Sequence, residues 1–129
     1  MESTPKRPAA ARVIVADDEA IIRMGLRSML EDAGHEIVGE ASTADEVFEL
    51  AQEWNADVVL LDVKMPGMDT LQAARILTKD FALPVVFVSA FGEPALVAQA
   101  TDAGAFAYIV KPVHLEELLA AIAVATARP

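Results

Sequence analysis

Apolar runs alternate with stretches of helical periodicity five times along the chain, starting at Arg12. Such alternation is typical of a parallel sheet covered by helices. Strands are expected at residues 12–17, 36–41, 57–62, 84–89 and 106–110, and helices at 19–33, 43–54, 70–80, 93–103 and 114–127. Because 129 residues fit one domain, the pattern predicts a single α/β domain over residues 12–127.

Two of the expected strands are apolar without interruption. The runs Val58–Leu61 and Val85–Val88 contain no polar residue. A strand that is apolar on both sides belongs in the middle of a sheet whose two faces are covered. We therefore place these two strands near the centre of the predicted sheet.

Polar side chains follow four of the apolar runs. Asp17 and Asp18 follow the first run, Asp62 the third, Ser89 ends the fourth, and Lys111 follows the fifth. The carboxyl ends of parallel strands meet at one edge of a sheet, where ligands bind. We therefore expect three carboxylates, a hydroxyl and an ammonium to share one site.

These groups suit a divalent cation beside a phosphoryl group. A cluster of carboxylates is unfavourable alone and favourable around a hard cation such as Mg²⁺. Asp62 can also act as a nucleophile that forms an aspartyl phosphate. Lys111 and Ser89 can then bind the phosphoryl oxygens.

Each of these residues also has an ordinary structural explanation. The acidic pair can favour a helix N-terminus, Asp62 can start a loop, Ser89 can bond locally, and Lys111 can be solvated. Their joint placement at strand ends favours a functional site.

Composition narrows the classes of partner. The formal net charge of −10 argues against a broad nucleic-acid-binding face and against docking on anionic membranes. The absence of cysteine excludes disulfides and thiol chemistry. No stretch resembles a signal peptide or a membrane span, so a cytoplasmic location is expected. Residues 1–11, rich in proline and alanine, are expected to form a mobile leader.

The order and spacing of the motifs resemble the signature of bacterial response-regulator receiver domains. The matching segments are Asp17–Asp18, Asp62 with Met65–Gly67, Ser89–Ala90 and Lys111–Pro112, and the resemblance covers about residues 12–127. It implies a flavodoxin-like (βα)5 doubly wound parallel sheet with strand order 2-1-3-4-5.

The resemblance also implies a magnesium site and a phosphoacceptor. Asp62 would accept the phosphoryl group. Asp18 and Asp62 would ligate Mg²⁺ directly, Asp17 would act through water, and Lys64 would contribute its backbone carbonyl.

Further roles follow from the same resemblance. Ser89 and Lys111 would bind the phosphoryl group, and Tyr108 would swing inward when Ser89 moves. The Lys111–Pro112 peptide bond would be cis.

Three positions bear on how far the family pattern applies. Thr70 stands where receivers commonly have glycine, so the loop before it is expected to bend differently. Lys64 and Phe91 occupy variable positions that flank the site. Either side chain can hinder or redirect the water that hydrolyses an acyl phosphate, and the sequence does not predict the direction.

A finer resemblance points to receivers joined to antiterminator-type (ANTAR) RNA-binding outputs. It rests on the segments DVKMP, SAF, AYIVKP and IIRMGL. No such output follows in this chain, so a stand-alone receiver and a fragment of a longer regulator both stay open.

The sequence therefore predicts a signalling domain that assists its own phosphorylation and dephosphorylation without being an ordinary turnover enzyme. The expected donor is a sensor histidine kinase or a phosphotransfer protein, and the target would read the surface of residues 93–127, which can also form a homodimer. One alternative is a phosphate-independent scaffold, and another is a domain that only drains phosphate from a shared kinase. An aspartate-nucleophile phosphatase is disfavoured because Lys64 stands where that class needs a second aspartate.

Overall fold

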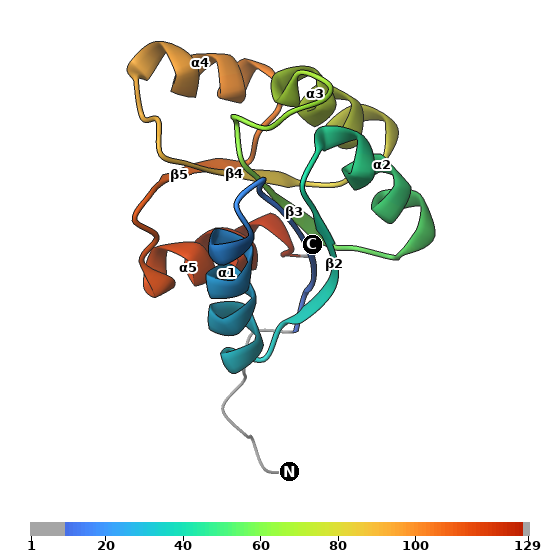
Figure 1. Cartoon of the computed structure of the whole chain (residues 1–129), viewed down its shortest axis with the longest axis vertical. Helices are drawn as coiled ribbons and strands as arrows, with labels where there is room; N and C mark the ends of the chain where they lie inside the picture. Colours follow the sequence, from blue (N-terminus) through green and yellow to red (C-terminus); the bar gives the residue numbers. More distant parts are fainter. Residues whose placement is uncertain (1–9, 128–129) are drawn as a thin grey trace.

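The computed structural model describes residues 10–127 and shows a five-stranded sheet between two layers of helices (Figure 1). The strands are β1 (Arg12–Ala16), β2 (Glu36–Ala41), β3 (Val58–Leu61), β4 (Val85–Ser89) and β5 (Ala107–Val110). The helices are α1 (Ala20–Asp32), α2 (Ala44–Glu53), α3 (Thr70–Asp80), α4 (Pro94–Asp102) and α5 (Leu115–Ala125).

All neighbouring strands are parallel, and their order is β2-β1-β3-β4-β5. Every residue of β3 and β4 is buried, as expected for central strands covered on both faces. The predicted flavodoxin-like α/β fold and its strand order are confirmed.

The sheet separates two hydrophobic cores. Side chains of a strand alternate between its faces, so Val13 and Val15 enter one core and Ile14 and Ala16 the other. Helices α1 and α5 cover the first face, and α2, α3 and α4 cover the second (Figure 1). The largest fully buried side chains of these helices are Leu30, Leu77, Leu118 and Ile122.

The predicted start of the domain at Arg12 is one residue too late. Ala11, expected in the leader, is 2 % exposed and belongs to the core on the α1 and α5 face. Its amide donates to Nδ1 of His35, and its carbonyl accepts from the amide of Glu36. These bonds extend the β1–β2 edge by one residue. The predicted leader otherwise lies outside the described residues, apart from the exposed Ala10.

Within residues 10–127, no helix combines the length and the apolar character that crossing a bilayer requires.

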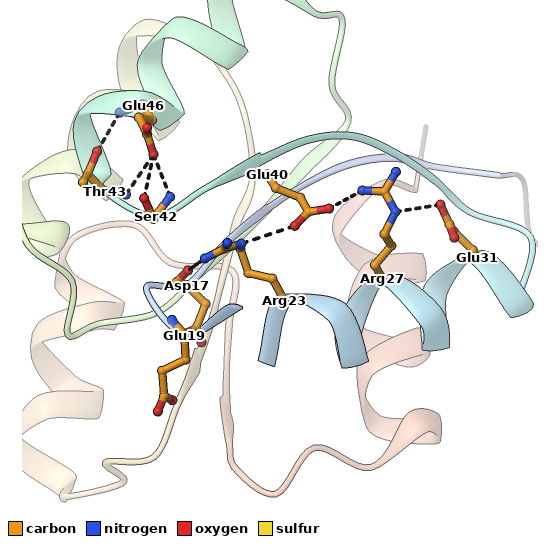
Figure 2. A network of polar contacts seen from close by, with 9 residues as sticks. All are labelled: Asp17, Glu19, Arg23, Arg27, Glu31, Glu40, Ser42, Thr43 and Glu46. Atoms are coloured by element: carbon orange, nitrogen blue, oxygen red, sulfur yellow. Dashed lines mark hydrogen bonds and ion pairs between the residues drawn. The ribbon is translucent and has the colours of Figure 1, made fainter. Parts of the chain in front are cut away.

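Helix α2 begins at a reciprocal hydrogen-bonding motif formed by Thr43 and Glu46. The Thr43 hydroxyl accepts from the Glu46 amide at 3.2 Å, and the Glu46 carboxylate accepts from the amides of Ser42 and Thr43 (Figure 2). The amides of Thr43 and Glu46 are among the backbone donors that the helix itself leaves unpaired. The hydrogen bonds that Ser42 and Thr43 donate to the Glu46 carboxylate lower its pKa.

We expect Thr43→Ala to lower the free energy of unfolding by about 1 kcal/mol, because it removes the side-chain acceptor of the cap. Urea unfolding followed by circular dichroism measures the change. Thr43→Ser is the matched control, since serine retains the hydroxyl, and it should stay close to the unaltered protein. Equal stabilities for the alanine and serine variants would contradict the role assigned to the cap.

Candidate functional site

The register of the sheet brings the predicted polar residues together. Ala16 of β1 lies opposite Leu61 of β3, so Asp17 and Asp62 leave adjacent strands at the same level. The amide of Asp62 still donates to the carbonyl of Ala16 at 3.0 Å. Ser89 of β4 pairs with the last residue of β5, which places Lys111 at the same edge.

Three carboxylates meet at this edge, as predicted. One oxygen from each of Asp17, Asp18 and Asp62 lies within 4.8 Å of the other two. Asp17 is 1 % exposed and Asp62 is 6 % exposed, whereas Asp18 is open to solvent. Two buried anions therefore sit beside one that incoming solutes can reach.

Lys111 directly follows β5, the strand at one end of the sheet, and its ammonium reaches these acids. Its Nζ lies 2.8 Å from Oδ2 of Asp17 and 3.5 Å from Oδ2 of Asp62. Burial alone would lower the pKa of Lys111, but the hydrogen bond that its ammonium donates to Asp17 and the negative charge of Asp62 outweigh burial, and the pKa is raised. The lysine thus offsets part of the negative charge.

Burial raises the pKa of the Asp62 carboxyl to about 6, and the negative charge of Asp17 adds to the rise. The hydrogen bond from the Lys64 amide to Oδ1 of Asp62, at 3.1 Å, and the charge of Lys111 act in the opposite direction. Ionisation of Asp62 is therefore less favourable in the folded chain than in water, and a bound cation would reduce that free-energy cost.

Ser89 and Tyr108 both bond to the backbone of Phe91. The Phe91 amide donates to Oγ of the fully buried Ser89 at 3.1 Å, and the Tyr108 hydroxyl donates to the Phe91 carbonyl. The Tyr108 ring also packs against Phe87, with centroids 6.0 Å apart. One residue of the β4–α4 loop thus connects the two predicted switch residues.

The loop after β3 forms the wall of a hollow of about 410 Å³. The hollow is lined by Asp18 and by residues 63–70, which include Lys64. Thr70 is buried, and its hydroxyl donates to the Val63 carbonyl across the loop. Gly67 adopts φ 96°, a conformation that glycine reaches at little cost. The Lys111–Pro112 peptide bond is cis.

Two contacts were not anticipated from the sequence. The ammonium of Lys64 lies 5.0 Å from the centroid of the Phe91 ring, so these flanking positions interact with each other. Arg23 of α1 donates from Nη1 to the backbone carbonyl of Asp17 at 2.6 Å (Figure 2). An arginine off the apolar face of a helix resembles any solvated arginine, so the sequence carries no distinct signal for the second contact.

Comparison with known proteins identifies the family. The model of the response regulator receiver domain matches residues 13–123. The chain belongs to this family. Receiver domains are components of two-component signalling and not typical enzymes.

Individual proteins support the same assignment. The chain is 46 % identical over 117 residues to the transcriptional regulatory protein PdtaR of Mycobacterium tuberculosis, covering 91 % of this chain and 57 % of PdtaR. PdtaR is an ANTAR-type regulator, so the finer resemblance is supported as well. The chain thus spans little more than half the length of this relative.

Solved structures agree with the fold. The receiver domain of the putative response regulator NarL from Mycobacterium tuberculosis has a TM-score of 0.85 and 35 % identity, covering 94 % of this chain and all of that one. A CheX–CheY–BeF3–Mg²⁺ complex from Borrelia burgdorferi has a TM-score of 0.82 and 27 % identity, covering 92 % of this chain and 90 % of that one.

We expect Asp62→Asn to raise the free energy of unfolding in the absence of divalent cations. The pKa of Asp62 in the folded chain, about 6, lies above the ordinary value of 3.8. The contribution of Asp62 to the free energy of unfolding is therefore fully present below its ordinary pKa of 3.8, and it is lost as the pH rises through about 6. A neutral amide avoids that loss, so the gain at pH 8 should be about 1–3 kcal/mol and should shrink toward pH 4.

Urea unfolding at several pH values, in the presence of a chelator, measures this gain. Asp18→Asn is the control, because it also removes a charge of the trio but from an exposed position, and its effect should be smaller. A less stable Asp62→Asn protein at pH 8 would contradict the assigned cost.

Proposed function

We propose that Asp62 accepts a phosphoryl group in an Mg²⁺-dependent reaction and that the resulting acyl phosphate switches the α4–β5–α5 surface. The donor is a sensor histidine kinase or a phosphotransfer protein. The observation that carries the proposal is the buried Asp62 carboxylate, held between two further carboxylates and the Lys111 ammonium.

The donor set fits a magnesium ion. Mg²⁺ prefers a few carboxylate and carbonyl oxygens and keeps several waters. In this proposal Asp18 and Asp62 are direct ligands, Asp17 acts through water, and Lys64 supplies its backbone carbonyl. Receiver domains bind Mg²⁺ in general, and the Borrelia burgdorferi relative was solved with this ion and BeF3, a phosphate mimic. When bound, the cation would neutralise charge on the phosphoryl oxygens.

The residues of the chain perform the transfer itself. A carboxylate oxygen of Asp62 forms a bond to phosphorus while the bond from phosphorus to the donor histidine nitrogen breaks, and that nitrogen keeps the electron pair. Lys111 already lies 3.5 Å from Asp62, so its ammonium is placed to donate to the incoming phosphoryl group.

Ser89 and Tyr108 convert the modification into a change at the surface. A phosphoryl group on Asp62 attracts the Ser89 hydroxyl, which draws it away from the Phe91 amide. Because Phe91 also binds Tyr108, both residues move together, and β5 and the start of α4 change position. Phe106 and Val110 are exposed on this surface, where a target protein or a second copy of the chain can contact them.

Two rival functions carry weaker support. A phosphate-independent scaffold would not need the buried acidic trio and Lys111. A phosphatase would need an acid or base two residues after Asp62, where the Lys64 side chain instead lies over Phe91. We propose that the chain acts in the cytoplasm, where histidine kinases present their phosphoryl groups.

We expect the chain to gain about 80 Da, the mass of one phosphoryl group, when it is incubated with acetyl phosphate and Mg²⁺. Intact-mass spectrometry measures the adduct. Asp62→Ala should remove it, as should a chelator, whereas Asp102→Ala on α4 should leave it in place because that residue is remote from the site. An unmodified protein would support the scaffold function, and an adduct that survives Asp62→Ala would refute the assignment of Asp62.

The coupling of Ser89 to Tyr108 can be observed directly, because Tyr108 is the single tyrosine of the chain. We expect the ¹⁹F resonance of a fluorotyrosine-labelled chain to shift on addition of Mg²⁺ and BeF3. In Ser89→Ala the shift should be at least halved, since the hydroxyl that reaches the mimic and the Phe91 amide is gone. An unchanged shift in this variant would show that Tyr108 responds without Ser89.

A further inference from the structure

Arg23 connects the acidic turn to two other elements of the fold. Its Nη1 donates to the backbone carbonyl of Asp17 at 2.6 Å, and its Nε donates to Oε1 of Glu40 at 3.2 Å. The guanidinium of α1 thus joins the end of β1 to β2 (Figure 2).

The bond to the Asp17 carbonyl acts on the orientation of Asp18. This carbonyl belongs to the peptide group that joins Asp17 to Asp18, and a peptide group is planar. A donor that fixes the direction of this carbonyl therefore fixes the orientation of the whole peptide group, and with it the position of the exposed Asp18. Asp18 is the carboxylate of the trio that lacks the protection of burial.

Arg23 also completes the set of donors around Asp17. Oδ1 of Asp17 accepts from the Glu19 amide at 2.9 Å, and Oδ2 accepts from Lys111 at 2.8 Å. With the carbonyl held by Arg23, each acceptor oxygen of Asp17 has a donor. Three donors from different parts of the fold thus determine the position of the acidic pair: the amide of Glu19, the ammonium of Lys111 and the guanidinium of Arg23.

Arg23 is itself held in place by a row of alternating charges. Glu40 accepts from Arg23 and from Arg27, and Arg27 also pairs with Glu31 (Figure 2). The Arg23 side chain is 20 % exposed, so it is partly shielded from solvent. The adjacent Glu40 carboxylate also balances the guanidinium charge, which limits its repulsion of a cation at the acidic trio.

We propose that Arg23 is a positioning residue that holds the Asp17–Asp18 peptide in the orientation that binding of a divalent cation requires. This role rests on the proposed magnesium site. Arginine suits it because its planar fork donates from two nitrogens to two acceptors, whereas lysine has a single nitrogen.

Arg27 provides a matched control. It lies one turn further along α1, shares the Glu40 acceptor, and has Glu31 as its second partner. Replacing either arginine by glutamine removes one charge and two hydrogen-bonding partners. The carbonyl of Asp17 loses its donor only in the Arg23 variant.

The first measurement is a calorimetric titration of the full chain with Mg²⁺. We expect Arg23→Gln to weaken binding by about tenfold, in the range found for residues that orient metal ligands, and Arg27→Gln to change it by less than about twofold. A loss in Arg23→Gln that is less than about five times the loss in Arg27→Gln would overturn the proposal.

The second measurement is made without metal. Backbone amide resonances of Asp18 and Glu19 should shift in Arg23→Gln more than in Arg27→Gln, because only the former frees the Asp17 carbonyl. Equal shifts would mean that Arg23 merely anchors the helix, and would overturn the proposal. If the unaltered chain binds no Mg²⁺, the proposed metal site fails, and the amide shifts still test whether Arg23 holds the turn.

Arg23→Lys replaces the glutamine variant if the latter does not fold. One ammonium nitrogen takes the place of the two donors that reach Asp17 and Glu40. We expect Mg²⁺ binding to be weakened at least about threefold, and a smaller loss would overturn the proposal.

Discussion

The pairing of Lys111 with Asp17 and Asp62 is the interaction on which the rest of the site depends. Two like charges about 4 Å apart repel by about 4 kcal/mol at an effective dielectric constant near 20, and burial adds to that cost. The chain tolerates two buried carboxylates because Lys111, directly after β5, pairs with both of them. The parallel register of the sheet makes that reach possible, since the strands end at one edge.

The fold and the convergence of the site could be predicted because both depend on short-range periodicity. Two-residue alternation and uninterrupted apolar runs identify strands, and a polar residue directly after such a run lies at the end of its strand. Asp62 and Lys111 are 49 positions apart in the chain, yet each follows a strand of the same parallel sheet. The family resemblance supplied the strand order, which alternation alone does not determine.

Other contacts could not be predicted because the partners of long side chains depend on which residues the fold brings near them. Arg23 reaches back to Asp17 and across to Glu40, and Lys64 lies over Phe91 from a different loop. Nothing in the spacing of these residues separates such contacts from solvated surface positions. Ala11 joins the core for a similar reason, since its partner His35 belongs to the loop before β2.

The link between Ser89 and Tyr108 runs through main-chain atoms of Phe91. Every residue type supplies the same carbonyl, and every type except proline supplies the same amide. The side chain at position 91 can therefore change during evolution while the connection between Ser89 of β4 and Tyr108 of β5 persists. Proline alone would remove the bond to Ser89, because it has no amide hydrogen. Position 91 can therefore accept any residue type except proline without loss of this link.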